Sequence, residues 1–204
     1  MARRSAGAIG PVKAEIEYEQ TSEGIIALVS VGQARFSFRV GKHPTGTSEP
    51  QGAYLWSVEE SGRQHIVQMV LTPVAQGAIQ SAVPHDAILI SHMNWETEFQ
   101  QQRLGRKMVR SGLGIFPTGE PYLQWSMEGK IGGSGDGETK ATGYSSHATT
   151  FHDGIIVLLG IQGLGAGWED PGLLDLKCWR AMLSLFRHSS VLKLPFLTPK
   201  PEAT

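Results

Sequence analysis

Residues 139–162 read TKATGYSSHATTFHDGIIVLLGIQ, and they decide the fold class of this chain. Asp153-Gly154 lies between two stretches that suit strands, and this dipeptide supplies the positive φ angles that a tight hairpin turn requires. We therefore expect two antiparallel strands, Thr139–Phe151 and Ile155–Gln162, joined at His152-Asp153-Gly154. The run from Ile155 to Ile161 is the longest apolar stretch of the sequence. It is far shorter than the roughly 20 residues that a helix needs to span a bilayer.

The residues before this hairpin predict further strands. Val12 to Glu19 alternates between apolar and charged residues, as in a strand with one face in water. Ile25–Val31 is almost continuously apolar and suits the inside of a sheet. Short connections such as Glu59–Gly62 favour antiparallel pairing, because parallel neighbours need a crossover of about a dozen residues or more. Gly41–Gly52 holds two Pro and three Gly and predicts a surface loop. Other strands are expected at residues 36–40, 53–58, 65–71, 87–90 and 122–127.

Two helices are expected. The first covers about Trp95–Arg110, with Asn94 or Ser91 as its N-cap, and stops at Ser111-Gly112. The second starts near the C-terminus, where Asp170 suits the N-cap and Pro171 the first helical position.

The apolar arc of the C-terminal helix is wider than that of an ordinary surface helix. One strong face is formed by Leu176, Trp179, Met182, Leu183 and Phe186, and it is widened by Leu173, Leu174, Cys178 and Leu185. We therefore expect the sheet to cover one side of this helix and a second surface to cover another. That second surface is the segment Val191–Thr204, the helix that contains Trp95, or another chain.

These elements predict one α+β domain with a mainly antiparallel sheet and two principal helices, the C-terminal one packed on the sheet. The domain is expected to cover residues 12–190. A flexible leader at residues 1–11 and an extended tail with three prolines at residues 191–204 are expected to flank it.

Composition limits the classes of function. The 204 residues carry a formal net charge of -1, from 18 Lys+Arg and 19 Asp+Glu, so the positive surface of a dedicated nucleic-acid binder is not expected. The only cysteine, Cys178, cannot form an intramolecular disulfide. Arg3 and Arg4 are not followed by an apolar run of signal-peptide length. We expect a cytoplasmic protein that binds neither nucleic acid nor membrane.

Few residues suggest catalysis. The candidates for acid or base chemistry are His85, Asp86, His92, His147 and Asp153. Most of these residues are expected in turns, at caps or on strands, where such side chains usually have structural or solvated roles. His147 and His152 should point to opposite faces of one strand, so a metal site is not expected. No cofactor is expected either, because the glycines of residues 132–137 and 163–167 do not lead directly into a helix.

The order of elements from Ala87 onward resembles the PsbP-like α/β/α sandwich group, which includes the DcrB-like proteins and the Eag-type secretion chaperones. The resembling order is a strand, a helix that begins with Trp95 and Phe99, the strand Tyr122–Met127, the hairpin Thr139–Gln162, and a last helix that ends in Met182–Phe186. It covers about half of the chain and rests on no motif. The resemblance implies a non-catalytic binding or chaperone module whose sheet grips partner segments.

Two classes of function follow from the residues. The first is a protein-binding or adaptor module, with a protein partner or a second copy of the chain bound through Trp168, Trp179, Leu183 and Phe186. Trp168 lies in a Gly-rich turn and is expected to be exposed, and Cys178 is expected to be a buried small apolar residue. The alternative is an enzyme, for instance a hydrolase, built from the scattered His and Asp residues. A carrier of small hydrophobic ligands is a third hypothesis.

Overall fold

The computed structural model describes residues 14–32, 34–42, 44–48, 53–74, 83–116, 119–130, 142–164, 168, 170 and 172–181. The expected leader, the glycines of residues 132–137, and everything from Met182 onward, including the expected tail, lie outside these residues.

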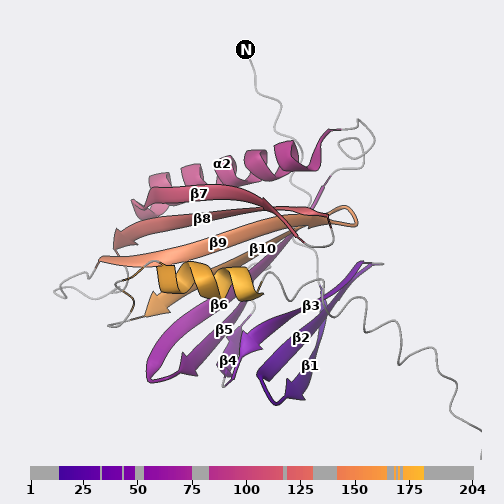
Figure 1. Cartoon of the computed structure of the whole chain (residues 1–204), viewed down its shortest axis with the longest axis vertical. Coiled ribbons are helices and arrows are strands. Elements are labelled where there is room, and N and C mark those ends of the chain that lie inside the picture. The colour runs from indigo at the N-terminus through magenta and orange to yellow at the C-terminus, as the bar shows by residue number, and fades with distance from the viewer. Residues whose placement is uncertain are drawn as a thin grey trace, which may run out of the picture.

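The strands of the described residues form two antiparallel sheets (Figure 1). The smaller sheet has the order β1-β2-β3, with strands β1 (Glu15–Thr21), β2 (Gly24–Val31) and β3 (Ala34–Gly41). The larger sheet has the order β4-β5-β6-β10-β9-β8-β7. Its strands are β4 (Pro44–Ser48), β5 (Ala53–Glu60), β6 (Arg63–Pro73), β7 (Lys107–Ile115), β8 (Pro121–Lys130), β9 (Thr142–His152) and β10 (Ile155–Leu164). The predicted α+β class with a mainly antiparallel sheet is confirmed.

The hairpin of residues 139–162 lies near the middle of the larger sheet. Ile155 pairs with His152, and the turn residues Asp153 and Gly154 have φ angles of 47° and 82°. Both angles are in the left-handed region that a two-residue hairpin turn requires. β10 lies between β9 and β6, so almost all of its side chains are buried, as its apolar sequence demands.

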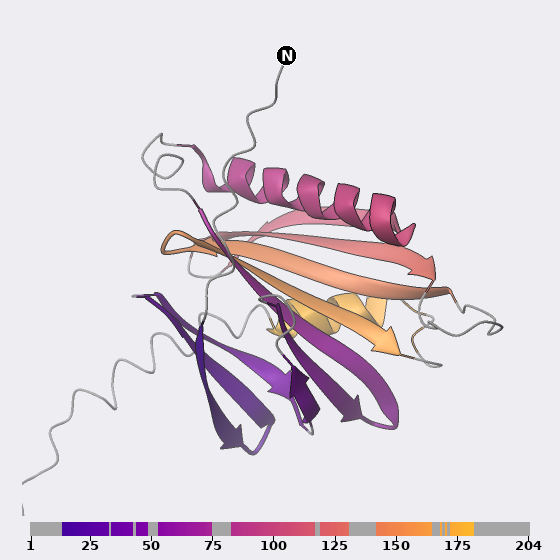
Figure 2. The same ribbon diagram turned by 180° about the vertical axis from the view of Figure 1, so that it is seen from behind.

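The larger sheet is covered on both faces (Figures 1 and 2). Helix α2 (His85–Leu104) packs on one face, against a core to which β10 contributes Ile156 and Leu158. The C-terminal helix, whose described residues are 172–181, and the smaller sheet cover the other face. The core on that side takes the alternate β10 residues Val157 and Leu159, which shows the period of two expected of a strand.

Two elements of the α2 region differ from the prediction. The expected strand at residues 87–90 is wrong, because these residues form part of α2, which begins after Pro84 rather than at Ser91 or Asn94. Four apolar residues have no periodicity that separates a strand from a helix. The expected end at Arg110 is also wrong. Gly105 has φ 62° and ends the helix at Leu104, and Lys107–Ile115 continues as β7.

The predicted loop Gly41–Gly52 contains strand β4, so that prediction is wrong in part. β4 is an end strand of the larger sheet, and among the described strands it pairs with β5 alone. Its first residue is Pro44, a position where a missing N–H removes no central ladder hydrogen bond.

The C-terminal helix packs with a different face from the one predicted. Asp170 caps it as expected, since its Oδ1 accepts a hydrogen bond from the Gly172 amide at 2.8 Å. Leu174, Cys178 and Ala181 are buried on the sheet, whereas Leu176 and Trp179 of the predicted strong face are partly exposed. The remaining members of that face, Met182, Leu183 and Phe186, lie outside the described residues.

Candidate functional site

The five candidate catalytic residues have separate neighbours. His85 and Asp86 lie in the first turn of α2. The His85 ring is 4.6 Å from the ring of Phe151, and Asp86 Oδ1 accepts a hydrogen bond from the Ala87 amide at 2.8 Å. Asp153 lies in the exposed hairpin turn, beside His152 at 3.4 Å.

His92 and His147 are buried between α2 and the sheet. Burial lowers the pKa of His92 to about 4. Burial, and secondarily the charge of Arg106, lowers the pKa of His147 to about 3. His147 stacks on Trp125, and its Nε2 lies 2.9 Å from Ser145 Oγ. Both rings are therefore neutral imidazoles at neutral pH.

Arg106 follows the end of α2 and also lies between this helix and the sheet. Its guanidinium donates to Gln100 Oε1 at 3.3 Å, to Ser145 Oγ at 3.3 Å and to Gln162 Oε1 at 2.9 Å. The side chain therefore connects the last turns of α2 to β9 and β10.

Within the described part of the chain, no group of three or more His, Cys, Asp or Glu side chains is arranged to hold a metal ion. No helix of the described residues is long and apolar enough to cross a membrane.

The four predicted binding residues differ in their exposure and in whether the structure describes them. Trp168 is buried, at 4% exposure, which contradicts the expectation that it is exposed. Its Nε1 donates to the backbone carbonyl of Gln64, a contact between distant segments that the local glycines do not reveal. Trp179 is 37% exposed, and Leu183 and Phe186 lie outside the described residues. Cys178 is buried, as predicted.

A groove lies between β7 and the C-terminal helix, which we call the β7 groove. Its volume is about 260 Å³. Alternate residues of β7 and β8 form its floor and outer wall, because Gly112 pairs with Gln124 and Gly114 with Tyr122. Asp175 of the helix lines the opposite side.

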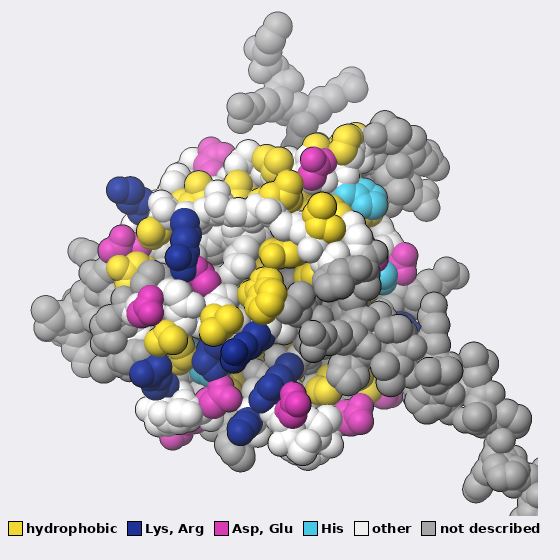
Figure 3. All heavy atoms as spheres, viewed as in Figure 1, with side chains coloured by type: hydrophobic (Ala, Val, Ile, Leu, Met, Phe, Trp, Pro, Cys, Tyr) yellow, Lys and Arg dark blue, Asp and Glu magenta, His cyan; other side chains and the backbone are white. Residues whose placement is uncertain are grey.

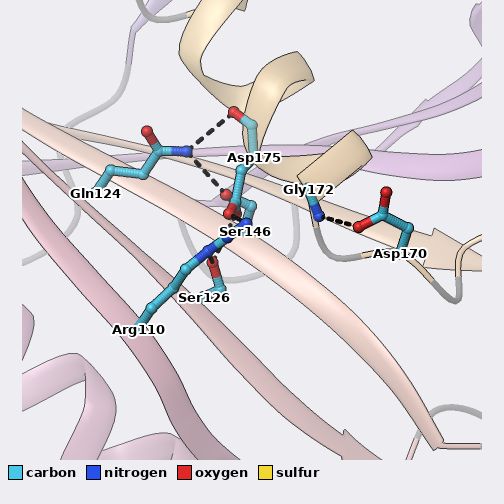
Figure 4. A network of polar contacts seen from close by, with 7 residues as sticks. All are labelled: Arg110, Gln124, Ser126, Ser146, Asp170, Gly172 and Asp175. Carbon is cyan, nitrogen blue, oxygen red and sulfur yellow. Dashed lines mark hydrogen bonds and ion pairs between the residues drawn. The ribbon is translucent and has the colours of Figure 1, made fainter.

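Asp175 holds the helix beside the groove through a polar network (Figure 4). Its carboxylate forms an ion pair with Arg110 of β7 and accepts a hydrogen bond from Ser126 Oγ at 2.6 Å. Its backbone carbonyl accepts a hydrogen bond from Gln124 Nε2 at 2.9 Å, and this amide also donates to Ser146 Oγ at 3.2 Å. The network connects the helix to three neighbouring strands, β7, β8 and β9.

Two glycines shape the groove differently. A Cβ at Gly114 would overlap the Tyr122 ring, which lies over this part of β7 and packs on Phe116 at 4.7 Å. The Tyr122 hydroxyl accepts a hydrogen bond from Trp179 Nε1 at 3.1 Å. A Cβ at Gly112 would meet nothing within 4 Å. The groove is therefore closed by Tyr122 at one end and open above Gly112.

The outer edge of β7 borders this groove. β7 is the last strand of the larger sheet, and no described strand pairs with its outer edge. Leu113 and Ile115 of this strand are 53% and 72% exposed. Apolar side chains gather along α2 and β7 and over the C-terminal helix (Figure 3). Among the described residues, this edge thus combines backbone groups that no strand pairs with and apolar side chains.

No protein-family model matches the chain, and no curated protein matches it in sequence.

Proposed function

We propose that this protein is a non-catalytic protein-binding module that takes up an extended segment of a partner protein along the edge of β7. The observation that carries this proposal is the exposed half of β7, Ser111–Ile115, with its apolar side chains beside the β7 groove. An exposed strand edge offers a row of backbone donors and acceptors, and an added strand satisfies them.

The N-terminal half of β7 is less suited to pairing. The pairing register of β7 with β8 changes between Met108 and Arg110, which marks a β-bulge. Lys107 is exposed at the start of the strand. Bulges and lysines are the features that keep natural sheet edges from pairing. Pairing is therefore expected over the five residues from Ser111 to Ile115, a usual length for a strand.

The two faces of the edge favour different side chains in the partner. Leu113 pairs with Leu123, so both lie on the α2 side of the sheet, where an added strand would contact apolar groups. On the opposite side lies the β7 groove, with the Arg110–Asp175 ion pair and Gln124. A segment that alternates between apolar residues and small or polar residues fits both faces.

The test is selection from a displayed library of peptides of about 12 residues, long enough to form one strand. Selected peptides are expected to alternate in polarity and to slow amide hydrogen exchange in residues 111–115. The double variant Leu113→Lys/Ile115→Lys should lose this binding, whereas Val109→Lys, an exposed residue at the bulge, should keep it.

Two results would count against the proposal. One is equal peptide binding by the double variant and by Val109→Lys. The other is a concentration-dependent dimer, seen by light scattering and abolished by the double variant, which would identify a second copy of the chain as the occupant of the edge.

A further inference from the structure

A second cavity lies on the far side of the C-terminal helix from Asp175, where the smaller sheet meets the larger one. Its volume is about 130 Å³. The end of β3, the β5–β6 hairpin, β10 and the helix enclose it. Its charged and polar lining consists of Arg39, Glu60, His65, Lys177 and Arg180, and we call it the basic cavity.

Positive charge exceeds negative charge in this lining. The only carboxylate among these residues belongs to Glu60, which forms an ion pair with Lys177. Arg39 interacts with Glu23 at 3.5 Å, on the solvent side. Arg180 adds a further cation from the helix. An anion in the cavity would therefore meet a net positive field, and guanidinium groups match the geometry of oxyanions.

His65 supplies a buried polar group to the same cavity. The residue is 2% exposed, and its ring packs edge-on against Trp168 at 5.4 Å. Its Nδ1 makes no hydrogen bond within the described part of the chain. A buried polar atom normally has a partner, so an unsatisfied ring nitrogen in the wall of a cavity points to a ligand group.

The protonation state of His65 suits an anion. Burial, and secondarily the charge of Lys177, lowers the pKa of His65 to about 4, while Glu60 opposes this effect. The imidazole is therefore neutral at neutral pH and donates one N–H. The volume equals that of about four water molecules in liquid water, which is enough for a tetrahedral oxyanion.

We propose that the basic cavity binds a small oxyanion, inorganic phosphate or the phosphoryl group of a phosphate monoester. Arg180, Arg39 and Lys177 provide the charge, and His65 provides a directional hydrogen bond at the inner wall. The groups of the cavity are separate from the β7 groove, so this site does not depend on the proposed peptide binding.

The test is a titration of the full chain with inorganic phosphate at constant ionic strength and neutral pH, followed through the ring resonances of His65. A saturable shift is expected, with the pKa of His65 rising when phosphate is bound. Arg180→Gln should weaken phosphate binding about fivefold or more, a typical effect of losing one charge-assisted contact. Arg103→Gln, an exposed residue of α2, is the matched control and should leave binding unchanged.

Three results would overturn the proposal. The first is the absence of a saturable shift up to about 50 mM phosphate, a concentration well above the millimolar range of weak binding. The second is an equal response to phosphate, acetate and chloride, which would show a general salt effect. Equal affinities of Arg180→Gln and Arg103→Gln would likewise exclude binding in this cavity. Binding of both phosphate and phenyl phosphate would assign the site to monoesters, and binding of phosphate alone would assign it to the free ion.

Discussion

Trp168 Nε1 donates a hydrogen bond of 2.7 Å to the backbone carbonyl of Gln64, which joins residues 104 positions apart in the sequence. The bond fixes the indole over the start of β6. The centre of the His65 ring lies 5.4 Å from the centre of the indole ring of Trp168. The Nζ of Lys177 lies 5.9 Å from the same indole ring centre. Trp168 therefore packs against His65, a residue that lines the basic cavity, and helps to keep the His65 ring away from water.

Replacing Trp168 with Phe is expected to destabilise the fold and to raise the pKa of His65. The substitution removes the donor to the Gln64 carbonyl, and the loss of such a part-buried hydrogen bond costs about 0.5–1.5 kcal/mol. The smaller ring also admits water to His65, which reduces the desolvation that lowers its pKa. Urea unfolding and a pH titration of the His65 resonances measure the two effects. Trp95→Phe is the control, because Trp95 is exposed on α2. A stable Trp168→Phe protein with an unchanged His65 pKa would contradict this account.

Stability is expected to fall on acidification before the carboxylates titrate. The folded protein holds the pKa of His65 and of His92 at about 4, and that of His147 at about 3. In the unfolded chain these groups titrate near 6.5, so the unfolded state binds more protons below that pH. Their contribution is present above about pH 6.5 and is lost as the pH falls toward the folded values.

Each histidine is expected to remove roughly 2 kcal/mol of the free energy of unfolding between about pH 7 and pH 5. Urea unfolding at both pH values measures the total. The charged groups that line the cavity around His65 are Arg39, Glu60, Lys177 and Arg180. His65→Gln should reduce the pH dependence by about one third. A flat stability curve between these pH values would show that the rings are solvated.

Gly114 and Gly112 form a matched pair on the groove side of β7. Gly114→Ala forces the Tyr122 ring to move, with loss of its contact to Phe116 and of the hydrogen bond from Trp179. Overpacking of this kind costs about 1–3 kcal/mol. Gly112→Ala meets open space and should be neutral or slightly stabilising, since alanine is less flexible in the unfolded chain. Thermal unfolding of the two variants measures the difference. Equal stabilities would show that Tyr122 is not held in place.

The β5–β6 and β9–β10 hairpins were predictable because their turns are local. Asp153-Gly154 and Ser61-Gly62 both adopt the positive φ angles of two-residue turns, and the glycine at the second position of each turn favours them. The strands on either side follow from their apolar residues. Strand β4 was not predictable, because its pairing with β5 is a contact between segments and not a property of its own Pro- and Gly-rich sequence.

The region of α2 shows what limited the prediction of the candidate site. The glycine that ends the helix, Gly105, was visible in the sequence as a helix stop, and with it the start of β7 at Lys107. Because the helix was predicted to continue to Arg110, β7 and its exposed edge were not predicted. The burial of Trp168 carried no local signal, because it depends on Gln64 and His65 of a distant strand.

Cys178 is expected to be inert in the folded protein and reactive only on unfolding. It is fully buried, burial raises the pKa of its thiol to about 12, and its Sγ donates to the Leu159 carbonyl at 3.6 Å. The thiolate is the reactive form, so an aromatic disulfide reagent should label one thiol per chain in denaturant and essentially none in native buffer. If labelling requires global unfolding, the less stable Gly114→Ala should label faster than Gly112→Ala by the ratio of their unfolding constants. Equal labelling rates of the two variants would instead show that the C-terminal helix opens locally, independently of β7, and would contradict the rigid attachment through Asp175 and Ser126.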